Sequence, residues 1–222
     1  MRNAKKLEYG FSNEEFEIRL QRAQELLYEN KLDALLITIP SNLRYFTGID
    51  TNFWESPTRP WFLVIPLSES PIAVIPEIGE KLFKKTFVKD IHTWPSPNLN
   101  GDDISPLKSL LESLPSRFGA IGAELGKEMS IRMPVLDLGL LQDNFKFDIV
   151  DGASLIWSLR IIKTLNEIKK IEKAAQIVSE VFSILPTFIS ANDSERDVAK
   201  KFKKEILKRG VDNIPYLPVV SG

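Results

Sequence analysis

The chain has 222 residues, of which 43% are hydrophobic and 27% charged, a composition that allows a globular protein with a sizeable core. Its 29 Lys and Arg residues nearly balance 30 Asp and Glu residues, so the charge of -1 gives no indication of nucleic-acid binding. No apolar run approaches the ~18 residues of a membrane-spanning helix, and no secretory signal is recognisable. Because cysteine is absent, disulfides and thiolate zinc sites are excluded, and we expect a cytoplasmic protein.

The first part of the chain predicts alternating helices and strands. A helix is expected over residues 13–30, with an apolar face formed by Phe16, Leu20, Ala23 and Leu27. A buried strand at 34–39 and a short helix at 41–48 follow. The apolar runs 61–66 and 71–76 flank a polar turn, which predicts an antiparallel hairpin.

The interleaving continues to about residue 155. Further helices are expected at 77–85, 104–114, 130–141 and 152–157, and further strands at 90–94, 120–124 and 145–150. Pro134 is compatible with its helix only within the first turn. The sequence therefore predicts an α/β domain with a mixed, partly antiparallel sheet flanked by helices.

The pattern changes near residue 160. One apolar stripe predicts a helix of roughly 28 residues, which Pro186 should kink or end near Ser183; it consists of Ile168, Ile171, Ala175, Val178, Phe182, Leu185 and Ile189. Ser194 and Asp197 predict a capping box at the start of a second helix, which stops at Gly210. Residues 216–222 read as the start of a strand. We therefore expect one domain over residues 1–158 and the beginning of another over 159–222.

Four segments carry a resemblance to a known family. In chain order these segments resemble motifs that occur in the same order in the creatinase/prolidase/aminopeptidase P family. They are NLRYFTG at 42–48, LRIIKTLNEI at 159–168, NDSE at 192–195 and VVSG at 219–222. The resemblance implies a creatinase/prolidase-like N-terminal domain. It also implies that residues 159–222 are the first helices of a truncated α+β domain with the pita-bread fold.

The family resemblance further implies an activity for a longer parent protein. In such enzymes two divalent ions, commonly manganese, cobalt, zinc or iron, activate water for attack on a peptide bond next to proline. The ligands of these ions are expected beyond residue 222, so we assign no catalytic residue and no metal ligand to this chain. We expect the chain to be inactive alone. We expect its parent to be a homodimeric Xaa-Pro dipeptidase or aminopeptidase P that acts on peptides. Binding to nucleic acid or to a membrane is not expected. The alternatives are that the chain is the N-terminal domain of a creatinase-like amidinohydrolase or lyase of the same fold, or that it is a non-enzymatic binding module.

The most unusual segment is 50–61, a loop rich in aromatic residues and proline. Phe53, Trp54, Arg59 and Trp61 are candidates for contact with a substrate channel or a partner. In the resembling family the N-terminal domain of one subunit helps to wall the active site of its neighbour, and Trp54 and Arg59 would then face that pocket. In the alternative interpretation Phe53 and Trp61 pack against the sheet while Arg59 pairs with Glu55.

Overall fold

The structure is a computed structural model that describes residues 10–56, 59–96 and 104–221. The described chain divides into two compact units, residues 10–162 and residues 163–221, and each is considered by itself. Residues 97–103, between the predicted strand at 90–94 and the predicted helix at 104–114, lie outside the described residues. Within the described ranges, no helix combines the length and the apolar composition that crossing a bilayer requires.

The unit of residues 10–162 is built on a mixed sheet. Its six described strands are ordered β4-β3-β2-β1-β5-β6, with bounds β1 (Ala34–Ile37), β2 (Phe62–Pro66), β3 (Ile72–Pro76), β4 (Asp90–Trp94), β5 (Ala120–Ala123) and β6 (Asp148–Asp151). Strand β2 runs antiparallel to β1 and β3, whereas the pairs β3–β4, β1–β5 and β5–β6 are parallel. The predicted mixed sheet and the predicted hairpin are both confirmed.

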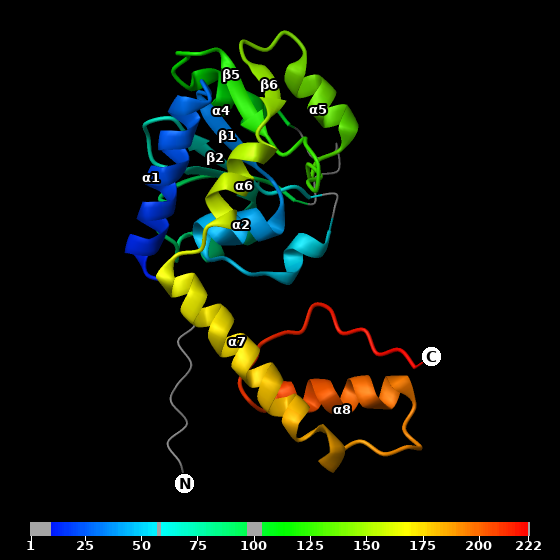
Figure 1. Ribbon diagram of the computed structural model, residues 1–222. Coiled ribbons are helices and arrows are strands. Elements are labelled where there is room, and N and C mark those ends of the chain that lie inside the picture. The colour runs from blue at the N-terminus through cyan, green and yellow to red at the C-terminus, as the bar shows by residue number, and fades with distance from the viewer. Residues whose placement is uncertain (1–9, 57–58, 97–103, 222) are drawn as a thin grey trace. The chain divides into compact units, whose positions relative to one another are not determined.

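Helices cover both faces of this sheet (Figure 1). One face packs against α1 (Asn13–Glu29), α2 (Pro40–Thr47), α3 (Glu80–Phe83) and α6 (Ala153–Ile161). The other packs against α4 (Ser105–Ser113) and α5 (Val135–Gln142). Side chains alternate along β1, so Leu35 and Ile37 join the first apolar cluster and Ala34 and Leu36 join the second. The result is a three-layer α/β/α arrangement.

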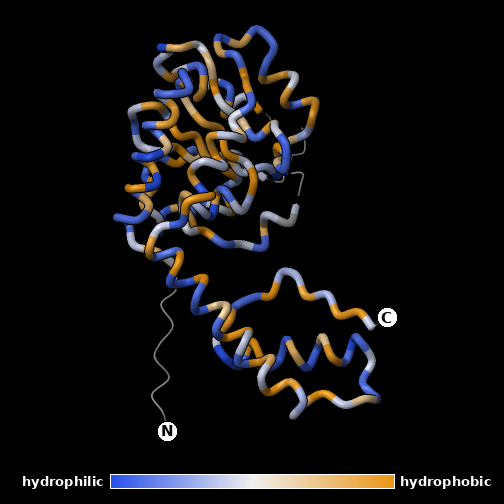
Figure 2. Tube along the Cα trace, viewed as in Figure 1, coloured by the Kyte–Doolittle hydropathy of each residue, from blue (hydrophilic) through white to orange (hydrophobic). Residues whose placement is uncertain are grey.

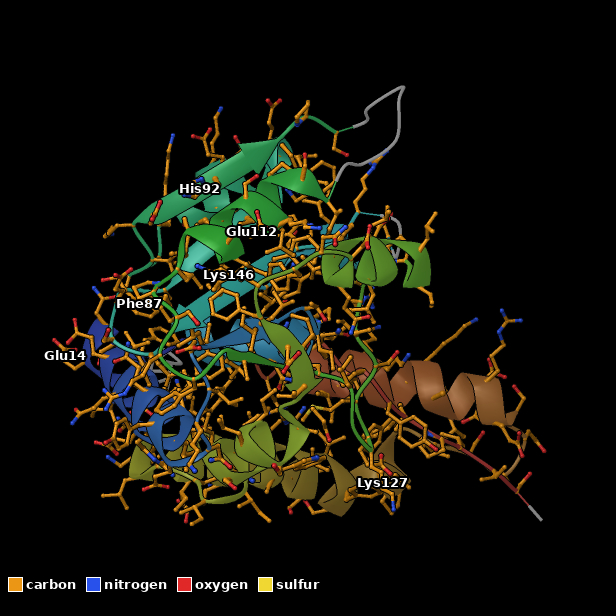
Figure 3. All side chains as sticks on the ribbon, turned by 90° about the horizontal axis from the view of Figure 1, so that it is seen from above. Glu14, Phe87, His92, Glu112, Lys127 and Lys146 are labelled. Carbon is orange, nitrogen blue, oxygen red and sulfur yellow. The ribbon has the colours of Figure 1, made fainter. Side chains whose placement is uncertain are left out.

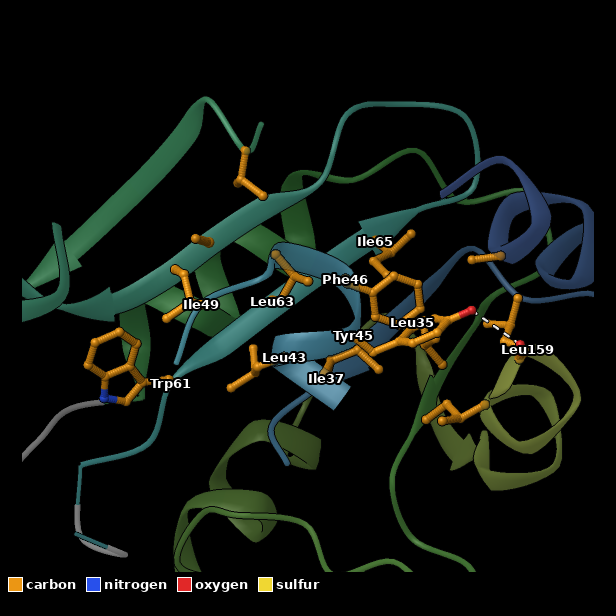
Figure 4. Packing of buried hydrophobic residues seen from close by; sticks show 14 of the residues in the cluster. Leu35, Ile37, Leu43, Tyr45, Phe46, Ile49, Trp61, Leu63, Ile65 and Leu159 are labelled. Carbon is orange, nitrogen blue, oxygen red and sulfur yellow. Dashed lines mark hydrogen bonds between the residues drawn. The ribbon is translucent and has the colours of Figure 1, made fainter. Parts of the chain in front are cut away.

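Helix α2 crosses the first face and fixes the packing there. Tyr45 and Phe46 lie among the side chains of β1 and β2, and the Tyr45 hydroxyl donates a hydrogen bond of 3.2 Å to the backbone oxygen of Leu159 in α6 (Figure 4). Gly48 ends the helix with φ at 73°. A Cβ at this position would stand 2.7 Å from the Phe16 ring, so α1 and the end of α2 can approach closely only with glycine here.

Local differences from the sequence prediction have physical causes. Helix α5 begins at Val135 rather than at 130, because Pro134 adopts an extended conformation and occupies the N-cap position. Strand β6 covers 148–151 rather than 145–150, since its register pairs Asp148 with Ala120 and leaves Phe147 buried before the strand. The predicted helix at 77–85 forms as a 3₁₀ turn, Glu77–Gly79, followed by the single-turn α3.

The unit of residues 163–221 holds two helices, α7 (Leu165–Ser183) and α8 (Glu195–Leu207). Helix α7 ends at Ser183, and Pro186 lies in the 3₁₀ turn Leu185–Thr187 that follows. The apolar residues of both helices recur among polar ones along the chain (Figure 2), and Val181, Phe202 and Ile206 form their small common core. The capping box of Ser194 and Asp197 is confirmed.

The predicted C-terminal strand is wrong for residues 216–221, which form neither helix nor strand. A strand is stabilised by hydrogen bonds to a neighbouring strand, and none of the described segments of this unit supplies one. Ser221 instead donates hydrogen bonds of 2.6 Å from its backbone nitrogen and 2.8 Å from its hydroxyl to the Glu195 carboxylate.

Candidate functional site

The candidate segment lies where the sheet topology favours a binding site. Because β1 and β5 are parallel and β2 is antiparallel to β1, the carboxyl ends of β1 and β5 share an edge with the amino end of β2. Residues 52–61 lead into β2 and therefore lie at that edge. Ligands of open α/β sheets commonly bind outside the carboxyl ends of the strands.

The four predicted contact residues do not share one environment. Trp54 is 6% exposed and Trp61 is 3% exposed, and their rings meet edge to face with 6.1 Å between centroids. The prediction that Trp54 faces a partner's pocket is wrong, because burying the indole in the core removes more apolar area from water than exposing it. Trp61 packs against the sheet, as one interpretation predicted, and its ring lies 6.0 Å from that of Phe83.

The other two residues point outward. Phe53 is 47% exposed and lies in the 3₁₀ helix Asn52–Glu55, whose first turn is capped by Thr51 accepting a hydrogen bond from the Phe53 backbone nitrogen. The prediction that Phe53 packs against the sheet is therefore wrong. Arg59 is exposed. Its predicted pairing with Glu55 falls on a side chain outside the described part. Contact with another molecule through Phe53 and Arg59 stays a prediction.

A buried polar network lies under this segment, and its centre is Glu124 at the end of β5. The carboxylate is fully buried. One oxygen accepts hydrogen bonds from the backbone nitrogen and hydroxyl of Thr38, both at 2.7 Å, and from the Ile39 nitrogen at 2.8 Å. The other accepts a bond of 2.6 Å from the Asn42 side chain. Four donors from the end of β1 and the start of α2 thus converge on one carboxyl group.

Two arginines extend the network outward. Arg160, near the end of α6, donates to the side-chain oxygen of Asn42. The Arg132 backbone nitrogen donates to the Thr38 hydroxyl at 2.9 Å, and its guanidinium donates to the backbone oxygen of Trp54. The network therefore joins β1, α2, β5 and α6 to the 3₁₀ helix that carries Phe53. This arrangement fixes the backbone on which the exposed residues of the segment stand.

Burial dominates the electrostatics of Glu124. Removal from water raises the pKa of this carboxyl above its ordinary value, while the hydrogen bonds from Asn42, Thr38 and Ile39 act in the opposite direction and compensate only in part. The sequence prediction assigns residues 120–124 only to a strand and therefore misses the role of Glu124. The available signal was a carboxylate directly after the apolar run of a central strand, where an ionisable side chain needs partners.

The described residues offer no ligand set for the metal ions that the family resemblance implies. No group of three or more His, Cys, Asp or Glu side chains in this part of the chain is placed to hold a metal ion. His92, the one histidine of the sequence, lies on the edge strand β4, where its ring pairs with Asp90 at 3.0 Å (Figure 3). The residues present therefore do not fit a dinuclear centre.

Comparison with known proteins agrees with the fold. A mixed sheet between two helical layers is the architecture of prolidase N-terminal domains. The family model of the creatinase/prolidase N-terminal domain matches residues 19–162, and the chain belongs to this family.

Relatives of similar sequence are peptidases by name. A probable dipeptidase PepE of Mycobacterium tuberculosis is 25% identical over 212 residues, which are 96% of this chain and 54% of that protein. An Xaa-Pro dipeptidase of Pyrococcus furiosus is 24% identical, over 91% of this chain and 52% of that protein. The crystal structure of a prolidase from Thermococcus sibiricus has a TM-score of 0.73 at 20% identity, covers 90% of this chain and 52% of its own, and shows the likeness of fold. The chain thus spans about half the length of the curated relatives it matches.

Proposed function

We propose that this chain is the non-catalytic N-terminal portion of a metal-dependent Xaa-Pro dipeptidase or aminopeptidase P. The observation that carries the proposal is the family match over 19–162, in a chain that spans about half of its peptidase relatives. In this proposal residues 1–158 form the N-terminal domain and 159–222 begin the catalytic domain. The two divalent ions would be held by residues that this chain does not contain.

The role proposed for the N-terminal domain is to shape a substrate channel and to contact a second subunit. Segment 50–61 supports this role because it presents Phe53 and Arg59 to solvent at the carboxyl edge of the sheet. An exposed aromatic ring and an exposed guanidinium on one segment suit contact with a peptide or another protein surface. The buried network of Glu124 holds the supporting backbone in place.

An activity assay tests the non-catalytic part of the proposal. The purified chain is incubated with an Xaa-Pro dipeptide and Mn²⁺, beside a reaction without protein. We expect no turnover above that blank, because the described residues gather no dinuclear ligand set. Metal-dependent hydrolysis by the chain itself would show that the proposed division of labour is wrong.

The contact role is tested by the oligomeric state. We expect a dimer mass in light scattering that falls toward the monomer on dilution, and a larger monomer fraction in the double variant Phe53→Ser, Arg59→Ala. Ile18→Ser is the matched control, since Ile18 on α1 is 50% exposed and Phe53 is 47% exposed. A monomer at all concentrations, or equal effects of both changes, would contradict the proposal.

A further inference from the structure

A cavity lies at the edge of the sheet opposite to the candidate segment. Its volume is about 570 Å³, within the roughly 300–1,000 Å³ of small-molecule sites. It is open to solvent, and its walls are the second half of α1, the turn between β2 and β3 and the segment between α4 and β5. The lining residues are Gln24, Glu25, Tyr28, Glu29, Asp33, Pro66, Leu67, Ser68, Glu69, Leu114, Pro115 and Arg117.

The cavity is held open by contacts among its own walls. The Gln24 side chain donates hydrogen bonds of 3.1 Å to the backbone oxygen of Pro66 and 2.8 Å to that of Glu69, which connects α1 to the turn after β2. The Asp33 carboxylate accepts bonds from the backbone nitrogens of Arg117 at 2.7 Å and Gly119 at 2.6 Å. These bonds fix the third wall, so the cavity is largely formed before any ligand binds.

The apolar part of the lining suits a hydrocarbon body. Among the lining residues, Leu114 and Pro66 are buried and Leu67 is half-buried. Tyr28 is 55% exposed, and its ring stands 6.0 Å from that of Phe118. A flat or aliphatic group that enters beside Tyr28 would remove exposed apolar surface from water, which is favourable.

The charged residues of the lining indicate the sign of the charge that a ligand should carry. The lining residues carry four carboxylates, those of Glu25, Glu29, Asp33 and Glu69, and one guanidinium, that of Arg117. The Asp33 oxygens are used by backbone donors, and the Arg117 guanidinium stacks 5.0 Å over the Tyr28 ring. Because the lining combines an apolar surface with an excess of negative charge, it disfavours an anionic ligand and favours a cationic one.

We propose that this cavity binds a small organic cation, a primary ammonium group on an aromatic or aliphatic body. The body would lie against Tyr28, Leu67 and Leu114, and the ammonium group would donate hydrogen bonds to Glu29 or Glu69. The site is separate from the edge proposed for substrate and partner contact. The proposal for the cavity can therefore be tested independently of the proposed function.

A charge series of probes tests this assignment. The full chain is titrated with 2-phenylethylamine, with the neutral 2-phenylethanol and with the anionic 3-phenylpropanoate, by calorimetry or by NMR shifts. We expect the amine to bind about fivefold or more tightly than the alcohol, and the carboxylate to bind least. Equal affinity for the amine and the alcohol, or no saturable binding of the amine, would overturn the proposal. A lysine-containing tripeptide that binds more tightly than the amine would overturn the assignment to a small molecule.

Variants locate the binding in the cavity. Glu29→Gln combined with Glu69→Gln should lower the affinity for the amine about fivefold and leave that for the alcohol unchanged. Tyr28→Ala should weaken both. Glu17→Gln is the matched control, because Glu17 is an exposed carboxylate of the same helix outside the lining. If the control weakens the amine as much as the double variant does, attraction to the general surface explains the binding and the site is refuted.

Discussion

At the residue scale, Glu124 combines two opposing effects in one carboxyl group. Burial disfavours the charged form and raises its pKa, whereas the donors from Thr38, Ile39 and Asn42 favour the charged form. Since burial is the larger effect, the folded protein binds a proton at Glu124 more readily than the unfolded chain does. This difference contributes stability that is fully present below the unfolded pKa of about 4.3 and is lost as the pH rises through the folded value.

The change Glu124→Gln isolates this contribution. The amide replaces one acceptor oxygen by a donor that faces other donors, so we expect the free energy of unfolding to fall by about 1–3 kcal/mol. The variant has no titration at this position, so its deficit relative to the wild-type chain should shrink as the pH rises. Urea unfolding between pH 4 and pH 8 measures both effects. Glu128→Gln in the adjacent exposed turn is the control, and a deficit that grows with pH would contradict the sign.

Arg19 is another buried charged residue, and it supports α1 from inside the core. Its guanidinium donates to the Tyr45 backbone oxygen at 2.6 Å and to Glu15 at 3.2 Å, and it lies 4.3 Å from the Phe11 ring centroid. Both members of the ion pair are almost fully buried. The sequence predicts neither, because the helical pattern shows only which face is apolar and does not show which charged residue that face includes.

Arg19→Met should be strongly destabilising, by about 3–5 kcal/mol, because Glu15 loses its buried cationic partner. The matched control is Arg22→Met, three residues along the same helix. Glu15→Gln in the Arg19→Met background should cost less than Glu15→Gln alone, since the charge then has no partner to lose. Denaturant unfolding of the four forms gives the coupling energy, and additive effects would show that the two side chains act separately.

At the element scale, local signals predict helix ends well. Ser194 with Asp197 and Gly48 at the end of α2 act within one turn, so three or four residues contain the whole interaction. The predicted C-terminal strand fails over residues 216–221 for the opposite reason. A strand depends on a partner that its own residues do not specify, and the described part of its unit offers none.

Helix α7 provides a test of such a local signal. Thr164 accepts a hydrogen bond from the Glu167 backbone nitrogen at 3.2 Å, and Glu167 accepts one from the Thr164 nitrogen at 2.8 Å. Thr164→Ala should lower the stability of the first turn by about 1 kcal/mol, whereas Thr164→Ser keeps the acceptor. Amide exchange at Glu167 should accelerate about fivefold in the alanine variant and little in the serine variant. Unchanged exchange in Thr164→Ala would mean that the cap contributes nothing.

At the scale of the whole molecule, the alternation of helices and strands predicts the α/β class but leaves the strand order open. That order depends on pairings between distant segments, such as Leu35 with Gly122 and Leu35 with Ile65. The candidate site has the same limit. Glu124 and Asn42 are 82 positions apart, and only the parallel pairing of β1 with β5 brings them together. The composition of residues 50–61 predicts an unusual loop, whereas the orientation of Trp54 depends on the core around Trp61.

The two apolar clusters of residues 10–162 predict that this unit folds without the remainder of the chain. Both faces of its sheet are covered by its own helices, so a fragment of residues 10–162 should unfold in one cooperative transition in urea. Fluorescence of the buried Trp54, Trp61 and Trp94 and the circular dichroism signal should give the same midpoint. A fragment of residues 10–152 lacks α6, and with it Leu159 and the hydrogen bond from Tyr45, so its midpoint should be lower. A full chain that unfolds cooperatively beside a 10–162 fragment that does not would show that the unit depends on residues 163–222.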